Sequence, residues 1–363
     1  MKIDFIIGSL RSGGAERVVS TLANHFAEKG YQVRIITFKE GDRYSLNKNI
    51  ERLRFHNNLP IFNYALARAF VYLIKFYFFK KNRPDIISSH INLMGLVTIP
   101  ISKLFGIKII VSEHNNHVAS SKIKMTSLLW KYLYPLADAV TILTSYDYPF
   151  FSSKNKKVIV LPNPSSFKPY NGQDGSRENS ILAIGDLDKY HHKGFDNLIE
   201  IAHGVIKERD DWKFVIVGEG DNGLEFLKNK IKEQGLENNI IFTGFRSDVQ
   251  DIMHKSSIFM LSSRFEGLPM VLIEAASQGM ACIAYDCVSG PSEIIDHNIN
   301  GLLINDQNKE EMVKNTIMLI DNEVMRTTFS SNAPKSVDKF SIEKIGKKWE
   351  DLFFSLINNN SKE

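Results

Sequence analysis

Cysteine is scarce in this chain of 363 residues, because Cys282 and Cys287 are the only two. Their spacing fits neither a zinc-binding pair nor a disulfide framework, so we expect reduced thiols, as in the cytosol. The sequence also lacks a charge-free apolar run of transmembrane length. The opening stretch, MKIDFIIGSL, lacks the long apolar core and small-residue cleavage site of a signal peptide. These absences argue against a disulfide-stapled secreted domain and predict a cytoplasmic protein.

Charge is unevenly divided along the chain, although the formal net charge is only +4. Residues 1–165 contain 23 Lys and Arg against 10 Asp and Glu, whereas the remainder contains 22 against 31. A basic half joined to an acidic half predicts that one domain faces an anionic surface. No nucleic-acid-binding module with interleaved basic and aromatic residues is present, so we predict an anionic membrane surface and no nucleic acid.

Apolar segments predict two series of alternating strands and helices. Strand-like runs such as 31–38 and 213–220 alternate with segments of helical spacing such as 13–30. A stretch rich in Pro, Gly, Ser and Asn, at 161–180, separates the two series. The predicted fold class is α/β, with two doubly wound parallel-sheet (Rossmann-like) domains, 1–165 and 166–340.

Ligands of such sheets bind beyond the carboxyl ends of the strands, so residues that follow strands are the candidates. Gly13-Gly14 follow the first strand and open a helix. Glycine there lets backbone approach a ligand, and a helix start attracts phosphate. A tight strand-to-helix turn would select glycine equally well.

The segment SRFEGLPMVLIEAASQG, residues 263–279, places a carboxylate on each side of a tight turn. We expect a strand, the loop RFEGLP, and then a helix that begins near Pro269. Glu274 is flanked by apolar residues of the expected helix, so we do not expect it on a solvent-exposed face. Its carboxylate can accept two hydrogen bonds, which suits the vicinal hydroxyls of a ribose. Glu266 would accept hydroxyls of a second ring, with a pyrophosphate between the two.

Lys193, in the stretch DLDKYHHKG, is expected to begin a helix and to stand where a leaving diphosphate gains charge. An ordinary surface lysine is the alternative. Asp186 and Asp188 of the same stretch form a D-x-D motif, which elsewhere binds Mg²⁺ or Mn²⁺. We discount this metal site because enzymes that bind a metal through this motif have a different fold, without two parallel-sheet halves. A site at His114 and His117 is discounted because no third ligand is in view.

In order along the chain, GGAER, PDIISSH, SEHNN, HHKGFDNLIE, IVGEGD, FTGFRSDV, FEGLPMVLIEA and SGPSEII resemble the family 4 retaining glycosyltransferases of GT-B fold. The resemblance covers nearly the whole chain and is of the type that assembles bacterial cell-surface glycans. It implies two domains facing across a cleft, with the acceptor on the first and the nucleotide-sugar donor on the second. It also implies that a last helix, about 341–363, crosses back onto the first domain.

The resemblance implies roles for individual residues as well. His114, Glu266 and Lys193 would be catalytic, with His114 meeting the donor sugar from the first domain. One feature departs from the family pattern, because Asp186 occupies the place of a phosphate-clamping arginine; either Lys189 or a histidine would then supply the second cation. The implied donor-binding residues are Gly14, Lys193, Phe245, Arg246, Glu266, Gly267, Leu268, Pro269 and Glu274.

The aromatic, basic segment IFNYALARAFVYLIKFYFFKKNRP, residues 61–84, is the candidate membrane contact. Its wide apolar face and basic rim suit a helix lying on an anionic bilayer, with Lys75, Lys80 and Lys81 against lipid phosphates. A core helix on the first sheet is the alternative. We expect both in part: an inner face on the sheet and an outer aromatic edge open to lipid.

The sequence thus predicts a retaining, metal-independent glycosyltransferase that moves a hexose or N-acetylhexosamine from a UDP-sugar to a lipid-linked or cell-surface glycan. It would need no cofactor, since the nucleotide sugar is a substrate, and it would lie on the inner face of the cell membrane. The first alternative is a UDP-sugar epimerase or hydrolase of GT-B fold, whose small soluble substrate needs no membrane helix. The second is a non-catalytic nucleotide-sugar-binding protein, which only Asp186 favours.

Overall fold

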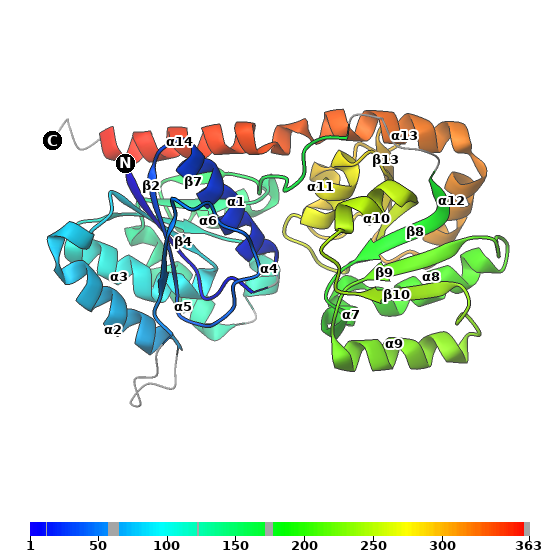
Figure 1. The fold of residues 1–363 in the computed structure, drawn as a ribbon, viewed down its shortest axis with the longest axis horizontal. Helices are drawn as coiled ribbons and strands as arrows, with labels where there is room; N and C mark the ends of the chain where they lie inside the picture. Colours follow the sequence, from blue (N-terminus) through cyan, green and yellow to red (C-terminus); the bar gives the residue numbers. More distant parts are fainter. Residues whose placement is uncertain (12, 57–64, 122, 171–176, 359–363) are drawn as a thin grey trace. The chain divides into compact units, whose positions relative to one another are not determined.

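The computed structural model describes residues 1–11, 13–56, 65–121, 123–170 and 177–358. The chain forms two compact units (Figure 1). The first consists of Met1–Ser166 and Phe340–Glu363, and the second of Phe167–Lys339. The division expected from the sequence, between residues 165 and 166, is one residue away. Parts of the expected linker (171–176), membrane segment (61–64) and last helix (359–363) lie outside the described residues.

A parallel sheet forms the centre of the first unit. Its described strands follow the order β3-β2-β1-β4-β5-β6-β7. Parallel neighbours need crossover connections, which here place helices on the faces of the sheet (Figure 1). The strands are β1 (Lys2–Ile6), β2 (Gln32–Thr37), β3 (Glu51–Arg54), β4 (Ile86–His90), β5 (Lys108–Ser112), β6 (Ala139–Ile142) and β7 (Val158–Val160). The helices are α1 (Gly14–Glu28), α2 (Ala65–Phe78), α3 (Gly95–Phe105), α4 (His117–Ser120), α5 (Lys124–Tyr132), α6 (Tyr148–Ser152) and, from the C-terminal segment, α14 (Ile342–Ile357).

The second unit repeats the doubly wound plan in the order β10-β9-β8-β11-β12-β13. The direction of winding reverses between β8 and β11, and this is the switch point at which such sheets bind ligands. The strands are β8 (Glu178–Ile184), β9 (Lys213–Val217), β10 (Ile240–Gly244), β11 (Ser256–Leu261), β12 (Ala281–Tyr285) and β13 (Gly301–Ile304). The helices are α7 (Tyr190–Lys193), α8 (Phe195–Ile206), α9 (Asp221–Glu233), α10 (Val249–Lys255), α11 (Met270–Ser277), α12 (Lys309–Asp321) and α13 (Glu323–Ser336).

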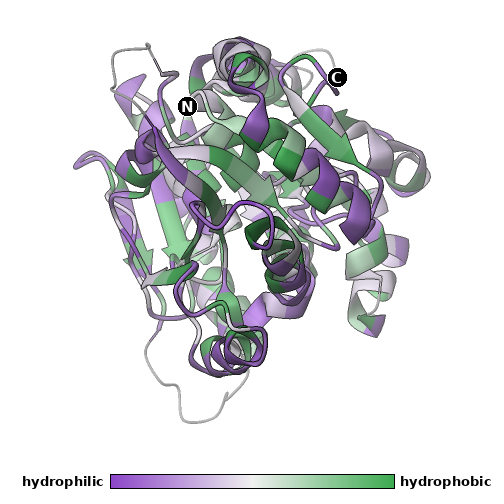
Figure 2. Ribbon diagram, turned by 90° about the vertical axis from the view of Figure 1, so that its right-hand side faces the viewer, coloured by the Kyte–Doolittle hydropathy of each residue, from purple (hydrophilic) through white to green (hydrophobic). Residues whose placement is uncertain are grey.

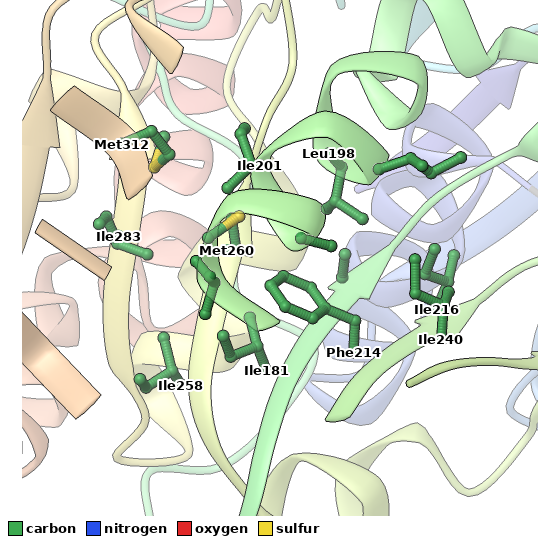
Figure 3. Close-up of a cluster of buried hydrophobic side chains, with 14 of the residues drawn as sticks. Ile181, Leu198, Ile201, Phe214, Ile216, Ile240, Ile258, Met260, Ile283 and Met312 are labelled. Carbon is green, nitrogen blue, oxygen red and sulfur yellow. The ribbon is translucent and has the colours of Figure 1, made fainter. Parts of the chain in front are cut away.

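Apolar side chains from strands and covering helices form a core in each unit. Figure 2 shows hydrophobic strands beneath helices that carry both hydrophobic and hydrophilic residues. In the second unit, Leu198 and Ile201 of α8 lie with Phe214 and Ile216 of β9 in one buried cluster (Figure 3). Full burial of such a side chain contributes roughly 1.5–3 kcal/mol, so this packing holds the switch-point strands in place.

A buried ion pair ties the first unit together. The Arg34 guanidinium donates to both carboxylate oxygens of Asp4, with Nε 2.7 Å from Oδ1, and Tyr77 donates to Oδ2 at 2.6 Å. A further guanidinium hydrogen bond reaches the carbonyl of Asn82, and the ring of Phe76 lies against the guanidinium. Removing one partner of such a pair would leave an uncompensated buried charge. The network therefore fastens α2 and its following turn to β1 and β2.

The C-terminal helix α14 packs on α1 of the same unit. Phe353 contacts Phe26 with ring centroids 5.2 Å apart. The carboxylate of Glu350 accepts a hydrogen bond of 2.7 Å from the Tyr31 hydroxyl and pairs with Lys29. These contacts hold α14 against α1, one of the helices that cover the first sheet.

The types of the elements named in the sequence analysis match the structure, with one error at Lys193. This residue ends the one-turn helix α7 instead of beginning the following helix, which starts at Phe195. Gly194, between them, has φ +69°, a left-handed conformation that terminates α7. Within the described ranges, no helix combines the length and apolar composition needed to cross a bilayer.

Candidate functional site

The candidate donor site of the second unit is built from the loops that follow β8 and β11. Both strands end at the same edge of the sheet, on either side of the switch point. The first loop runs through α7 to Gly194, and the second is RFEGLP, residues 264–269. The sequence places Lys193 and Glu266 on these two loops, and the structure brings them together.

Lys193 and Glu266 form an ion pair across the switch point. Lys193 Nζ lies 2.8 Å from Glu266 Oε1, which also accepts a hydrogen bond of 2.7 Å from Ser263. Glu266 is only 8 % exposed. A solvated loop position for this carboxylate is therefore excluded. The pair places a cation and an acceptor side by side at the edge where ligands of this fold bind.

Backbone contacts hold the two loops against each other. Ser262 Oγ donates to the carbonyl of Lys193 at 3.0 Å, and the Arg264 amide donates to the carbonyl of His192 at 2.9 Å. The Arg264 guanidinium also pairs with Asp196 at the start of α8. These bonds fix the backbone on both sides of Lys193, so its side chain reaches Glu266 from a rigid base.

Gly194 makes this approach possible because it has no side chain. A Cβ at this position would lie 1.8 Å from the carbonyl oxygen of Ser262. Only glycine combines such a contact with the left-handed backbone conformation at low cost.

A third loop, which follows β12, holds the turn that contains Glu266 through hydrogen bonds and close packing. Ser289 Oγ donates to the carbonyls of Glu266 and Gly267, at 3.0 and 3.1 Å. Gly290, with φ +104°, lies so close that a Cβ would meet Pro269 Cδ at 2.6 Å. The turn 266–269 is therefore fixed from both sides. The motif SGPSEII contributed to the family resemblance, but the sequence analysis assigned it no role. Its residues Ser289 and Gly290 make these contacts with the turn.

Glu274 lies on the second turn of α11 and is fully buried. Pro269 is the N-cap of this helix, as its position after the strand predicted. Gly267 and Leu268 are buried with it in the same turn. A buried carboxylate on the ligand-facing end of a sheet is a strong functional candidate, since a surface role as a dipole-complementing residue is excluded.

Asp186 and Asp188 use their carboxylates on neighbouring backbone and side chains. Asp186 accepts from the Asp188 amide and pairs with Lys189 at 3.0 Å, and Asp188 accepts from the Gly223 amide at 2.9 Å. Lys189, the cation proposed to replace the missing arginine, is thus engaged with Asp186. Among the described residues, no group of three or more His, Cys, Asp or Glu side chains is arranged to hold a metal ion.

Phe245 and Arg246 follow β10, which is separated from β11 in the sheet by the two strands β9 and β8. Phe245 is 55 % exposed, and Arg246 forms an ion pair with Asp248 at 2.5 Å on the surface. The structure therefore does not gather this pair with Lys193 and Glu266. Their predicted place beside a nucleotide base stays a prediction.

In the first unit, Gly14 begins α1 directly after the loop that follows β1. The Gly13 amide donates to the Tyr44 hydroxyl at 3.0 Å, and that hydroxyl donates to the Gly13 carbonyl at 2.9 Å. Gly14 itself is exposed at the start of the helix. Both readings of the Gly-Gly turn, a tight turn and a ligand approach, are compatible with this geometry.

His114 follows β5 in the first unit and is hydrogen-bonded to a second histidine. Its Nε2 lies 2.9 Å from Nδ1 of His90, the last residue of β4. Burial lowers the pKa of His114 to about 4 and holds the pKa of His90 well below its usual value. Both rings are therefore neutral near pH 7. No local sequence signal points to His90, because its partner follows a different strand.

Glu113, next to His114, is a buried carboxylate that accepts hydrogen bonds from Trp130 Nε1 and the Tyr134 hydroxyl. Burial raises its pKa to about 7 despite these donors. Asp147, hydrogen-bonded to His117 at 2.7 Å, is also nearly buried. His117 is thus held in place by Asp147.

The predicted membrane segment forms α2 and the short turn Lys80–Asn82, with residues 61–64 outside the described chain. Leu73 and Tyr77 are buried in the core, whereas Phe78 and Phe79 are 68 % and 58 % exposed. Lys75, Lys80 and Lys81 are exposed as well. Phe76, on the same segment, packs against Arg34 and Phe55.

Solved structures with the same architecture identify the fold class. Sucrose-phosphate synthase from Thermosynechococcus elongatus superposes with a TM-score of 0.85 at 17% identity, covering 99% of both chains. HepE of Anabaena, solved with UDP and glucose, has a TM-score of 0.81 at 17% identity, covering 98% of this chain and all (100%) of that one. The two doubly wound sheets define the GT-B class of glycosyltransferases.

Sequence comparison identifies the family. The family model "Glycosyltransferase Family 4" matches residues 12–164, and "Glycosyl transferases group 1" matches residues 171–336. An uncharacterized glycosyltransferase of Haemophilus influenzae is 30% identical, covering 97% of this chain and 99% of that one. A Campylobacter jejuni α-1,4-N-acetyl-D-galactosaminyltransferase acting on a diphosphoundecaprenol-linked glycan is 31% identical, covering 99% of both. The chain belongs to the family 4 glycosyltransferases of GT-B fold.

The close approach at Gly194 predicts the effect of adding one methyl group. Gly194→Ala should lower the free energy of unfolding by roughly 1–3 kcal/mol more than Gly235→Ala, because the new Cβ overlaps the Ser262 carbonyl. Gly235 is the matched control, since its φ is +68° and a Cβ there would meet nothing within 4 Å. Urea denaturation of both variants measures the difference. Equal losses would show that the loops do not depend on this contact.

Proposed function

We propose that this glycosyltransferase transfers a hexose or N-acetylhexosamine from a UDP-sugar to a lipid-linked or cell-surface glycan, with retention of anomeric configuration and without a metal ion. The observation that carries the proposal is the Lys193–Glu266 pair at the switch point, on the loop that leads into the helix with buried Glu274. The relatives support the substrate classes. A related Escherichia coli enzyme is named a UDP-Gal:α-D-GlcNAc-diphosphoundecaprenol galactosyltransferase, and HepE was solved with UDP-glucose.

The donor site has one group for each part of a nucleotide sugar. Glu274 accepts hydrogen bonds from the two ribose hydroxyls. Lys193 faces the diphosphate, and Glu266 accepts hydroxyls of the sugar. In the absence of donor each of the paired groups neutralises the other, so neither charge is left uncompensated in a partly buried place. A donor, with an anionic end and a hydroxyl-rich end, offers a new partner to both.

Lys193 also accounts for catalysis without a metal. The diphosphate gains negative charge as its bond to the sugar breaks, and a fixed ammonium group stabilises that charge in the transition state. In the retaining reaction the acceptor attacks from the same face as the leaving group. The leaving diphosphate takes the proton of the acceptor hydroxyl, so no protein base is needed at that step.

Glu274 provides the first test of the donor site. Glu274→Gln should weaken UDP binding about ten- to a hundredfold, because a charged hydrogen-bond acceptor contributes roughly 1.5–3 kcal/mol. Calorimetric titration with UDP measures the loss. Ser277→Ala, a change at another buried side chain of α11, should leave the affinity unchanged.

A thermal-shift screen of UDP- and GDP-sugars on the wild type identifies the donor class, since a ligand at a hundred times its Kd stabilises by about 2.7 kcal/mol. Stabilisation by GDP-sugars alone would contradict the UDP assignment. Unchanged UDP affinity in Glu274→Gln would contradict the ribose contact.

Lys193 and EDTA together test metal independence. Lys193→Ala should lower turnover by about a hundredfold or more, as expected for the loss of a charge-stabilising group, whereas EDTA should leave wild-type turnover unchanged. Lys230→Ala is the matched control, because Lys230 has a similar side-chain exposure (21 % against 22 %) and also pairs with a glutamate. In the same assay, NMR of the product should show the anomeric configuration of the donor.

Activity that EDTA abolishes and Mn²⁺ restores would assign the diphosphate to Asp186 and Asp188 instead. An inverted product would contradict the front-side reaction while leaving the donor site intact.

We also propose that the first unit lies on an anionic membrane surface, at the cytoplasmic face, through the end of α2. Exposed Phe78 and Phe79 stand beside Lys80 and Lys81, so rings and ammonium groups are available on the same short segment. Such a combination inserts apolar side chains at the interface while the lysines meet lipid phosphates. A lipid-linked acceptor would then be reached without leaving the bilayer.

Charge reversal tests this membrane contact. The triple change of Lys75, Lys80 and Lys81 to Glu should cost several kcal/mol of binding to anionic vesicles, since each basic residue contributes about 1 kcal/mol. The control reverses three exposed lysines of the second unit, Lys207, Lys228 and Lys232, and so removes the same charge elsewhere. Co-sedimentation with anionic and neutral vesicles measures the difference. UDP affinity should be the same in all three proteins, and equal vesicle binding by the two triple variants would contradict the proposed surface.

A further inference from the structure

The outer face of α5 carries a row of exposed apolar side chains, here called the α5 stripe. Met125, Leu128 and Tyr132 are 45 %, 56 % and 59 % exposed. Their spacing of three and four residues places them on one side of the helix. Another side of α5 packs into the core of the first unit, where Leu129 and Trp130 are buried. The stripe is therefore an apolar face that stays uncovered among the described residues.

Positive charge lies beside the α5 stripe. Lys124 and Lys131 are exposed, and at about 100° per residue both fall next to the stripe, on the side away from the core. Lys131 Nζ lies 5.1 Å from the centre of the Tyr132 ring. Residues 114–137 contain no Asp or Glu, and the next acidic residue, Asp138, forms ion pairs with two other lysines. The surface is thus complementary to a partner that is anionic as well as apolar.

The order of the strands places α5 on the same face of the sheet as α2. The connections from β3 to β4, from β4 to β5 and from β5 to β6 all run in one direction along the sheet, and right-handed crossovers put their helices on one face. α3 contacts both α2 and the turn Tyr134–Leu136 that follows α5. Leu104, near the end of α3, and Leu136 are exposed. Exposed apolar side chains therefore occur at the ends of three neighbouring helices.

We propose that the α5 stripe is a second contact with an anionic bilayer, in which its side chains enter the interface while Lys124 and Lys131 meet lipid phosphates. The choice of a bilayer rests on the proposed function, whose acceptor is lipid-linked. A second copy of the chain fits less well, because a symmetric contact brings two patches of the same charge together. Contacts through both α5 and the end of α2 fix the orientation of the first unit on the membrane, whereas one contact leaves it free to rotate.

A tryptophan introduced into the stripe reports this contact directly. On vesicles that contain anionic phosphatidylglycerol, Leu128→Trp should emit at shorter wavelength and be quenched by brominated acyl chains, because its ring enters the interface. Ser127→Trp is the matched control, since Ser127 is exposed on the same helix but points about 100° away from Leu128. The three native tryptophans are buried and give a constant background. Equal or absent quenching of the two introduced rings would overturn the inference.

The affinity for the same vesicles provides a second measurement. Met125→Gln/Leu128→Gln should bind about tenfold more weakly than wild type, because two apolar side chains no longer enter the interface. The control, Ile241→Gln/Val324→Gln, changes two exposed apolar residues of the second unit and should bind as wild type does. All four positions are exposed, so both variants should fold normally. UDP affinity should be equal in all three proteins.

The α5 contact can be separated from the α2 contact and from self-association. If charge reversal at the end of α2 abolishes vesicle binding whereas the glutamine variant of the α5 stripe binds like wild type, the inference is overturned and the α2 contact stands. If wild type forms a dimer that this glutamine variant loses, a second copy covers the stripe and the inference is likewise overturned. Transfer to a water-soluble acceptor analogue needs no bilayer, so its absence in wild type would contradict the proposed substrates, whatever the vesicle measurements show.

Discussion

The missing side chain of Gly194 determines how closely the two loops of the donor site approach. Because a Cβ at this position would lie 1.8 Å from the Ser262 carbonyl oxygen, the loop after β8 lies against the end of β11 only with glycine there. Backbone hydrogen bonds on both sides of Lys193 depend on this approach, and so does the ion pair with Glu266. The hydrogen bonds of Ser289 then hold the other side of the same turn. The site is thus rigid because backbone, rather than long side chains, sets its spacing.

Each unit uses the same property of parallel sheets in its own way. All strands of such a sheet end at one edge, so residues that are distant in sequence meet there. In the second unit this edge brings together Lys193 and Glu266, and in the first it brings together His90 and His114. The first pair is charged, whereas the two rings of the second are neutral near pH 7 because burial lowers their pKa values.

The fold and several site residues followed from local sequence signals. Alternating apolar segments identified the strands and helices, and the two carboxylates around Gly-Leu-Pro singled out the loop that the structure places at the switch point. Lys193 shows where local signals fail. Its segment has helical character on both sides, but Gly194 ends one helix and the next begins at Phe195. The left-handed turn at Gly194 is not visible in a hydrophobic pattern.

The sequence by itself determined the fold class, the approximate division into two units and the identity of the candidate residues, because periodicity, turn chemistry and motif order are local properties of the chain. Tertiary structure decided which residues act together. The Lys193–Glu266 pair joins positions 73 residues apart, and Asp186 pairs with Lys189 on the surface. The hydrogen bond between His90 and His114 depends on the register of β4 with β5. Such pairings depend on strand register and on close backbone contacts, and these arise only when the whole sheet has been assembled.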